Sequence, residues 1–182
     1  MRVVAGKAKG VVLKTPEGMQ TRPTADRVKE ALFSILQFDL PGTTVLDLFG
    51  GTGQLGIEAI SRGAKSAVFV DAGDAPCKLI KENLRRAKME GEGRVVRADY
   101  LQFLSQCREK FDIIFLDPPY AEVFLENSIK DGGLSSPRFC EAFSTCTQSS
   151  FESHISISTI SGFSLPIFKS ASSPFIASIV SL

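Results

Sequence analysis

The stretch VLDLFGGTGQLG, from Val45 to Gly56, sets the fold class of this chain of 182 residues. It begins with the large apolar residues of a buried strand, passes through a glycine-rich turn and continues into a helical pattern. Gly51, Gly53 and Gly56 have the spacing G-x-G-x-x-G, and Asp71 follows 20 residues after Gly51. A strand, such a loop and a helix in this order indicate a nucleotide-binding α/β unit, in which glycine lets the backbone approach a ligand closely.

Strands and helices alternate along the chain beyond this loop. Short apolar runs predict strands at residues 44–49, 66–71, 94–99 and 111–117. Amphipathic patterns predict helices between them, at residues 55–63, 76–90 and 100–107. This alternation is typical of a mostly parallel sheet with helices on both faces, so we expect a Rossmann-like α/β fold.

A separate block precedes this unit. In residues 1–18, short β-branched runs are broken by glycines, which predicts a small hairpin. The stretch TRPTADRVKEALFSILQF then places apolar residues at helical spacing, so we expect an amphipathic helix that starts near Thr24 or Asp26 and ends near Pro41. Residues 1–30 carry seven Lys and Arg against three acids, which predicts a basic face.

The overall composition indicates a soluble globular protein. Apolar residues make up 43% and charged residues 23%, values that argue against global disorder. No apolar leader or run of membrane-spanning length is visible, so we expect a cytoplasmic protein. The cysteines Cys77, Cys107, Cys140 and Cys146 lack paired C-x-x-C spacing, and His154 is the single histidine. Reduced, buried thiols are therefore expected rather than a metal site.

Two cofactor classes share the glycine-rich loop. A nicotinamide dinucleotide would place its pyrophosphate at the helix N-terminus, and Asp71 would bind the ribose hydroxyls. Asp47, however, lies inside the strand four residues before Gly51, where a second anion would not help to bind a pyrophosphate. An acid at that position suits a ligand with a positively charged amino group, and S-adenosylmethionine is such a ligand.

With Asp47 included, the stretch resembles the first motif of class I methyltransferases, an acid followed by a glycine-rich turn. The resemblance implies that the loop packs against the methionyl part of S-adenosylmethionine and that the acid ending the second strand holds the ribose. It also implies that Asp99 and Tyr100 lie near the adenine ring, although Asp99 alone would indicate only a helix cap. The candidate cofactor residues are therefore Asp47, Phe49, Gly51, Gly53, Asp71, Asp99 and Tyr100.

The last of the regular strands runs into IIFLDPPY, from Ile113 to Tyr120. Prolines donate no backbone hydrogen bond and restrict the residue before them, so the chain must leave the sheet in a stiff turn. That turn would present the Asp117 carboxylate and the Pro118 carbonyl as acceptors for an exocyclic amino group, while Tyr120 would stack on the base. The segment matches the [D/N]-P-P-[Y/F] motif of amino-methyltransferases, so Asp117, Pro118, Pro119 and Tyr120 are the candidate catalytic residues.

Four stretches together resemble one family more closely than any of them does alone: AGKAKG, TRPTADRVKEALF, LDLFGGTGQLGIEA and FLDPPY. From Met1 to about Ile129 the chain resembles the bacterial 16S ribosomal RNA guanine-N2 methyltransferases of the small-subunit methyltransferase D type. The resemblance implies methyl transfer from S-adenosylmethionine to N2 of guanine 966 in small ribosomal subunits, without a metal.

The same resemblance implies that RNA is the macromolecular partner. The basic N-terminal block would meet RNA phosphates, which position a substrate without reading its sequence. Taken singly, each of these basic residues is better explained as part of a solvated face. The candidate RNA-binding residues are Lys7, Lys9, Arg22, Thr24 and Arg27. We expect a monomer that binds 16S rRNA in an assembled or assembling small subunit.

The character of the sequence changes near Lys130. Residues 131–182 contain 15 serines and only five charged residues, and helical periodicity disappears. We therefore divide the chain into a methyltransferase domain at residues 1–130, with residues 1–40 as its hairpin and helix, and an atypical serine-rich region at 131–182. Serine alternates with isoleucine there in a pattern that suits strands, yet the region does not resemble the end of the family, whose last strands are expected to be missing or aberrant. A reading-frame shift in the gene would produce such a change, and true divergence is the alternative.

Three other functions stay open on the sequence. The loop and D-P-P-Y would also suit an amino-methyltransferase that acts on DNA adenine or on a protein glutamine. An inactive module that binds S-adenosylmethionine or RNA would agree with the atypical C-terminal region. A dinucleotide oxidoreductase ranks last, because it leaves both Asp47 and D-P-P-Y unexplained.

Overall fold

The computed structural model describes residues 1–16, 23–117, 155–160, 163–170 and 173–178. For residues 23–28 and for the three C-terminal segments, the description covers the backbone alone. Cys140, Cys146 and His154 lie outside the described residues, whereas the thiols of Cys77 and Cys107 are buried, as predicted.

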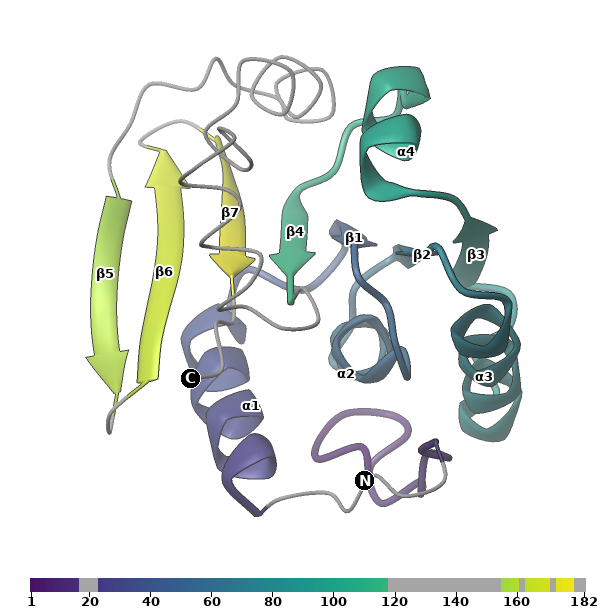
Figure 1. Cartoon of the computed structure of the whole chain (residues 1–182). Coiled ribbons are helices and arrows are strands. Elements are labelled where there is room, and N and C mark those ends of the chain that lie inside the picture. The colour runs from purple at the N-terminus through teal and green to yellow at the C-terminus, as the bar shows by residue number, and fades with distance from the viewer. Residues whose placement is uncertain (17–22, 118–154, 161–162, 171–172, 179–182) are drawn as a thin grey trace.

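One sheet runs through the molecule in the strand order β3-β2-β1-β4-β7-β6-β5 (Figure 1). Its strands are β1 (Thr44–Asp47), β2 (Ser66–Asp71), β3 (Gly93–Arg97), β4 (Ile113–Leu116), β5 (Ile155–Ile160), β6 (Phe163–Ser170) and β7 (Ser173–Ser178). The pairs β1–β2, β2–β3 and β1–β4 are parallel. The predicted Rossmann-like fold is confirmed, and each of the four strands expected before residue 118 lies where the apolar runs predicted it.

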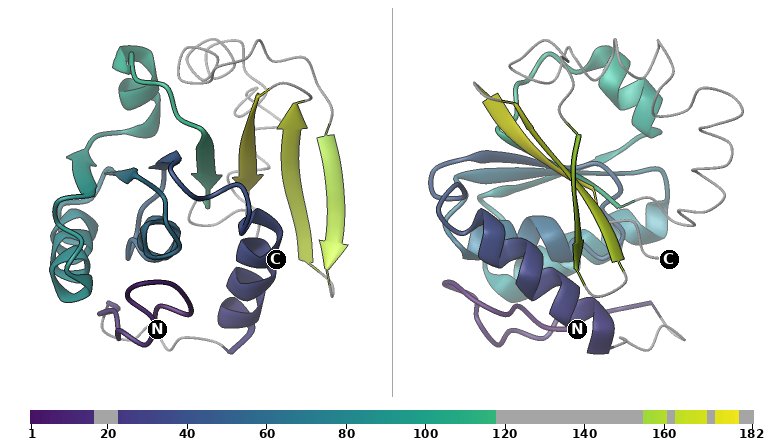
Figure 2. Two further views of the ribbon diagram at one scale, coloured as in Figure 1. Left: turned by 180° about the vertical axis from the view of Figure 1, so that it is seen from behind. Right: turned by 90° about the vertical axis from the view of Figure 1, so that its left-hand side faces the viewer.

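Helices cover both faces of this sheet (Figure 2). They are α1 (Pro23–Leu36), α2 (Gln54–Ser61), α3 (Asp74–Ala87) and α4 (Tyr100–Gln106). Alternate strand residues face opposite ways, so Val45 and Phe69 pack in the core with α1, α2 and α3, whereas Leu46 and Val68 pack with α4. Among the described residues, none of the helices has the length and apolar character needed to cross a membrane.

The N-terminal segment, residues 1–16, folds back on itself as the small hairpin that the sequence predicted, and the Val3 N–H donates to the Val11 carbonyl at 2.9 Å. A single antiparallel bridge joins Arg2 to Val12. The backbone N–H groups of Val4 and Ala5 donate instead to the Glu58 carboxylate of α2, at 2.8 and 3.0 Å. Because Glu58 accepts from these two donors, the backbone pairing of this hairpin is confined to a few residues around the bridge.

The C-terminal segments extend the sheet beyond β4. β7 pairs with β4 in parallel, with Ile114 opposite Ile176, and β6 and β5 follow as antiparallel neighbours. The alternation of serine with isoleucine suits strands, and strands are present here, so the last strands of the sheet are not missing. The pairing with β7 gives β4 a neighbour on both sides, which agrees with the full burial of Ile113 through Leu116.

Candidate functional site

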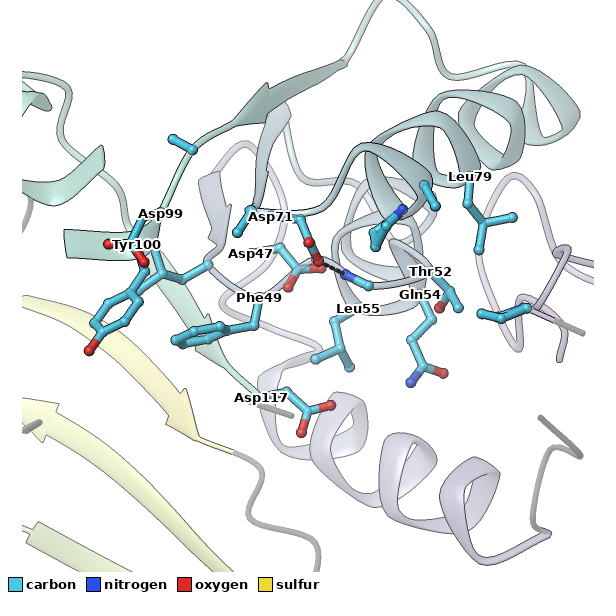
Figure 3. A pocket seen from close by; sticks show the side chains of 18 of the residues that line it. Asp47, Phe49, Thr52, Gln54, Leu55, Asp71, Leu79, Asp99, Tyr100 and Asp117 are labelled. Atoms are coloured by element: carbon cyan, nitrogen blue, oxygen red, sulfur yellow. Dashed lines mark hydrogen bonds between the residues drawn. The ribbon is translucent and has the colours of Figure 1, made fainter. Parts of the chain in front are cut away.

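A cavity of about 970 Å³ opens at the carboxyl ends of the first four strands (Figure 3). Asp47 ends β1, Asp71 ends β2, Asp99 follows β3 and Asp117 follows β4, and all four line this pocket. Parallel strands bring their carboxyl ends to one edge of a sheet, which is where open α/β folds bind ligands. The four acids therefore meet in one crevice, as the order of the strands predicted.

The glycine-rich loop forms the floor of the pocket. Gly53 is the N-cap of α2 and has a φ of 77°, a left-handed conformation that favours glycine. Gly56, in the first turn of α2, packs so closely on the Phe69 ring that a Cβ atom would lie 2.3 Å from Cε1. These glycines bring α2 against the sheet and leave Gly51 and Thr52 at the pocket surface.

Asp47 is the most deeply buried acid of the site, with 1% of its surface exposed. Its Oδ2 accepts a hydrogen bond from the backbone N–H of Gly56 at 3.1 Å. Its Oδ1 has no hydrogen-bond partner among the described residues. Burial, together with the nearby Asp117 and Asp71, raises the pKa of Asp47 to about 8. The pocket thus holds an acceptor that needs a donor or a positive charge.

Asp71 has a different environment at the end of the neighbouring strand. Its Oδ2 accepts from the backbone N–H of Gly51 at 3.0 Å, and its Oδ1 accepts from that of Gly73 at 2.8 Å. One carboxylate therefore ties the glycine-rich loop to the turn that begins α3. Each oxygen keeps a second lone pair, so Asp71 still has capacity for hydroxyl donors of a ligand.

Two aromatic rings form the wall of the pocket near β3. Phe49 and Tyr100 lie with their ring centroids 5.3 Å apart at an angle of 45°. Beside them Asp99 caps α4, because its Oδ1 accepts from the N–H of Leu101 at 2.9 Å and of Gln102 at 3.4 Å. The cap reading of Asp99 is thus confirmed, while its predicted role near adenine stays a prediction. An aromatic wall beside a hydrogen-bond acceptor suits a nucleobase.

Asp117 completes the crevice from the side of β4 (Figure 3). Burial raises the pKa of its carboxyl group to about 6. At neutral pH this group is therefore mainly ionised and acts as a hydrogen-bond acceptor. The other members of the predicted motif, Pro118, Pro119 and Tyr120, lie outside the described residues.

The predicted RNA-binding residues are spread over the N-terminal block. Lys7 and Lys9 are exposed, and Lys7 forms an ion pair with Glu92. Arg22 lies outside the described residues. Thr24 and Arg27 belong to the first turns of α1, where only the backbone is described. Their contact with RNA stays a prediction.

One basic residue of this block is not on a solvent face. Lys29 is 2% exposed, its Nζ donates to the carbonyl of Arg2 at 2.8 Å, and it lies 3.8 Å from the Glu58 carboxylate. Helical spacing turns this position toward the core, where Glu58 and a backbone carbonyl compensate its charge. The basic face predicted from residues 1–30 is therefore smaller than the count of Lys and Arg suggested.

Several residues that line or support the pocket were not predicted from the sequence. Met1 and Pro16, the two ends of the N-terminal segment, both line it. Asn83 of α3 does not line the pocket but supports the glycine-rich loop, because its Nδ2 donates to the Thr52 carbonyl at 2.9 Å. The sequence did contain an indication of Asn83, since this polar residue interrupts the buried, otherwise apolar face of α3 formed by Ile80, Leu84 and neighbours.

In the part of the chain that the structure describes, no cluster of His, Cys, Asp or Glu has an arrangement suited to a metal ion.

Comparisons with known proteins agree with this geometry. The protein named "Putative rRNA methyltransferase YlbH" of Bacillus subtilis is 42% identical over 125 residues, which cover 67% of this chain and 68% of that protein. Ribosomal RNA small subunit methyltransferase D of Escherichia coli is 36% identical over 129 residues, which cover 71% of this chain and 65% of that protein. This chain thus spans about two thirds of the length of these curated relatives.

The solved structure titled "Putative methyltransferase yhhF from Escherichia coli" has the same fold, with a TM-score of 0.64 and 28% identity over 81% of this chain and 73% of that one. A family model, conserved hypothetical protein 95, matches residues 1–132 and therefore includes the glycine-rich loop, the four acids and D-P-P-Y. The match ends close to Lys130, where the composition changes. The chain belongs to the conserved hypothetical protein 95 family.

Proposed function

We propose that this protein is an S-adenosylmethionine-dependent methyltransferase that acts on ribosomal RNA of the small subunit. The observation that carries the proposal is the pocket itself, in which the acids from four strand ends surround a glycine-rich loop and an aromatic wall. The sequence relatives named as ribosomal RNA methyltransferases support the choice of reaction.

S-adenosylmethionine, the cofactor predicted from the sequence, fits the groups that the pocket presents. It supplies an electrophilic methyl group on a sulfonium centre. The buried Oδ1 of Asp47 offers an acceptor for the positively charged amino group, and Asp71 offers acceptors for ribose hydroxyls. Phe49 and Tyr100 provide the apolar wall against which a nucleobase would pack.

Asp117 would hold the amino group that receives the methyl group. An exocyclic amino group is a poor nucleophile, because its lone pair is delocalised into the base. A carboxylate that accepts one of its hydrogens favours attack through nitrogen and stabilises the positive charge that develops there. The Pro118 carbonyl is proposed as the second acceptor and Tyr120 as the surface on which the base stacks.

The chemistry in this proposal rests on alignment, not on a covalent enzyme intermediate. Holding the amino nitrogen in line with the methyl group supplies on the order of 7 to 11 kcal/mol of the barrier reduction. The rigid frame for this alignment is the sheet, because Asp47 on β1 and Asp117 after β4 lie on directly paired strands. The pairing of these strands therefore fixes the backbone from which Asp47 projects and the point at which the chain enters Asp117.

The finer target is the N2 amino group of guanine 966 in 16S rRNA, within assembled or assembling small subunits in the cytoplasm. The resemblance of the N-terminal block to the small-subunit methyltransferase D type supports this target. Residues 1–130 would form the catalytic domain, and Lys7, Lys9, Arg22, Thr24 and Arg27 would contact RNA phosphates.

Methyl transfer to small ribosomal subunits tests the proposal. Labelled S-adenosylmethionine is offered with subunits that lack the guanine 966 methyl group, with duplex DNA and with a release factor. We expect label only in 16S rRNA, and label in DNA adenine or in a protein glutamine would overturn the choice of substrate. Asp117→Ala and Tyr120→Ala should each abolish transfer while S-adenosylmethionine still binds. Asp39→Ala, which removes an exposed acid after α1, is the matched control and should keep full activity.

A further inference from the structure

Asn83 lies on the buried face of α3 and contacts two segments that are distant from it in sequence. Its side chain is 0% exposed. Its Oδ1 accepts a hydrogen bond from the backbone N–H of Lys14 at 2.7 Å. Its Nδ2 donates to the carbonyl of Lys14 at 3.0 Å and to the carbonyl of Thr52 at 2.9 Å. Both amide hydrogens and the carbonyl oxygen of Asn83 are therefore engaged by backbone groups.

The two segments that Asn83 joins both border the pocket. Thr52 belongs to the glycine-rich loop, and Lys14 belongs to the N-terminal segment, whose ends Met1 and Pro16 line the same pocket. The N–H of Leu13 donates to the Met1 carbonyl at 3.0 Å, which holds these two ends together. The N-terminal segment thus forms part of the pocket wall, and Asn83 is its buried attachment to the loop.

The bond to Thr52 fixes a single peptide group of the loop. Asn83 holds the carbonyl of the peptide between Thr52 and Gly53, and the N–H of that peptide donates to the Gly50 carbonyl at 2.6 Å. Both ends of this peptide dipole are therefore held, which sets the orientation of the turn. A rotated peptide at this point would move the backbone that faces the pocket.

We propose that Asn83 is a positioning residue for the cofactor, which holds the glycine-rich loop and the N-terminal segment at a fixed separation so that the pocket is complete. The inference rests on the proposed function, because that function names S-adenosylmethionine as the ligand. Asn83 is not among the residues that line the pocket, so it acts through the peptide groups of Lys14 and Thr52.

A primary amide is the group that this position requires. Aspartate has the same shape, yet it has no hydrogen to donate and would place a carboxylate against two carbonyl oxygens. Alanine would leave both carbonyls and the Lys14 N–H without these partners. Asn83→Asp should therefore disturb the loop more than Asn83→Ala does, an order that loss of volume alone would not produce.

Ser61→Ala is the matched control, because Ser61 tethers the N-terminal segment elsewhere. Ser61 is 3% exposed, and its Oγ donates to the Ala5 carbonyl at 2.5 Å and accepts from the Ala8 N–H at 3.0 Å. It belongs to the end of α2 and does not line the pocket. Asn83→Ala and Ser61→Ala thus both loosen the same segment, and Asn83→Ala alone releases Thr52.

The test compares the full-length protein and its variants by calorimetric titration with S-adenosylmethionine, by hydrogen exchange of residues 50–54 without ligand, and by thermal unfolding. We expect Asn83→Ala and Ser61→Ala each to lower the Tm. Asn83→Ala should raise the Kd for S-adenosylmethionine about tenfold and speed exchange in the loop, and Ser61→Ala should leave both near wild type. With RNA substrate, the KM for S-adenosylmethionine should rise in Asn83→Ala while kcat stays within about twofold.

Equal effects of Asn83→Ala and Ser61→Ala on the Kd and on loop exchange would overturn the inference, as would an unchanged Kd in Asn83→Ala. Absence of S-adenosylmethionine binding by the wild-type protein would overturn the proposed function instead. In that case the exchange of residues 50–54 without ligand still decides the role of Asn83. Faster exchange in Asn83→Ala alone would support it, and no difference from Ser61→Ala would overturn it.

Discussion

The ends of β1 and β2 carry equivalent acids in very different states. Asp71, at the end of β2, is half-buried, and each of its oxygens accepts a backbone N–H, from Gly51 and from Gly73. Asp47, at the end of β1, is 1% exposed, and one of its oxygens has no partner among the described residues. One acid therefore holds the loop in place, and the other keeps an unused acceptor for a ligand.

Burial alone does not produce the state of Asp47. Glu58 of α2 is 0% exposed, yet its oxygens accept from the N–H groups of Val4 and Ala5 and from Nε of Arg62, and Lys29 lies nearby. Where a buried acid serves the fold, this chain surrounds it with donors, as buried charges require. Among the described residues, the Oδ1 of Asp47 therefore differs from the Glu58 oxygens in facing the pocket, and not in its degree of burial.

The largest expected effect is the pH dependence of stability that Asp47 causes. The folded state keeps this carboxyl protonated up to about pH 8, whereas in the unfolded chain it ionises near its ordinary pKa of 3.8. The folded state binds more protons in this window, so Asp47 makes stability fall as pH rises from about 5 to about 8, an effect on the order of a few kcal/mol.

Asp47→Asn should remove this contribution. In urea unfolding at pH 5, 6.5 and 8 without ligand, the stability of the variant relative to wild type should increase with pH. Asp71→Asn should show no such gain, because the asparagine NH2 group cannot accept a hydrogen bond and one of the Gly51 and Gly73 N–H groups would lose its acceptor. Parallel curves for Asp47→Asn and wild type would contradict the description of Asp47 as an acid whose charge lacks a partner.

The second effect concerns the loop that Asp71 holds. Asp71→Ala removes the acceptors for Gly51 and Gly73, and hydrogen bonds to a charged group contribute about 1.5 to 3 kcal/mol each. We expect the Kd for S-adenosylmethionine to rise about 100-fold, measured by calorimetric titration. Asp74→Ala, an exposed acid in the first turn of α3, is the control and should bind normally. An unchanged Kd for S-adenosylmethionine in Asp71→Ala would show that the glycine-rich loop keeps its position without the hydrogen bonds to Asp71.

The positions of the four acids could be predicted from the sequence, but which of them has hydrogen-bond partners could not. The strand, the glycine spacing and the acids at 47, 71, 99 and 117 follow from apolar runs and from periodicity, because local patterns determine where parallel strands end. Which acid is satisfied depends on backbone donors such as Gly73 and Gly56, and those positions are set by tertiary packing. The attachment of the N-terminal hairpin to α2 was missed for the same reason, since Glu58 lies 54 residues from Val4.

The C-terminal strands, in contrast, could be predicted from a local pattern alone. Their alternation of serine and isoleucine predicted strands correctly, although the region does not resemble the family. A backbone ladder requires little beyond residues that suit a pleated surface, so a dissimilar sequence can still pair with β4. Buried polar contacts such as those of Asn83 need particular side chains, and they lie within the residues that the family model matches.

The third effect is the pH dependence of cofactor binding. At pH 6.5 to 7.5 the ligand-free protein holds Asp47 mainly protonated. An ammonium group favours the carboxylate, so binding should displace a proton and the Kd should fall about tenfold per pH unit at most. Asp47→Asn should show a flat profile, and so should wild type with methylthioadenosine, which lacks the amino group. A flat profile for wild type with S-adenosylmethionine would mean that Asp47 does not meet a cation.

The smallest effect separates the two roles of Asp99. Its Oδ1 caps α4 through Leu101 and Gln102, and its side chain is exposed, so its contribution to a ligand is modest. Asparagine is as good an N-cap as aspartate, whereas alanine costs about 1 kcal/mol. Asp99→Asn should therefore keep the Tm and raise the Kd for S-adenosylmethionine less than about fivefold, and Asp99→Ala should lower both stability and affinity. If Asp99→Asn binds S-adenosylmethionine as wild type does while Asp99→Ala binds it more weakly, Asp99 resembles Asp71, because it shapes the pocket by holding backbone N–H groups. Asp47 would then be the acid that meets the charge of the ligand.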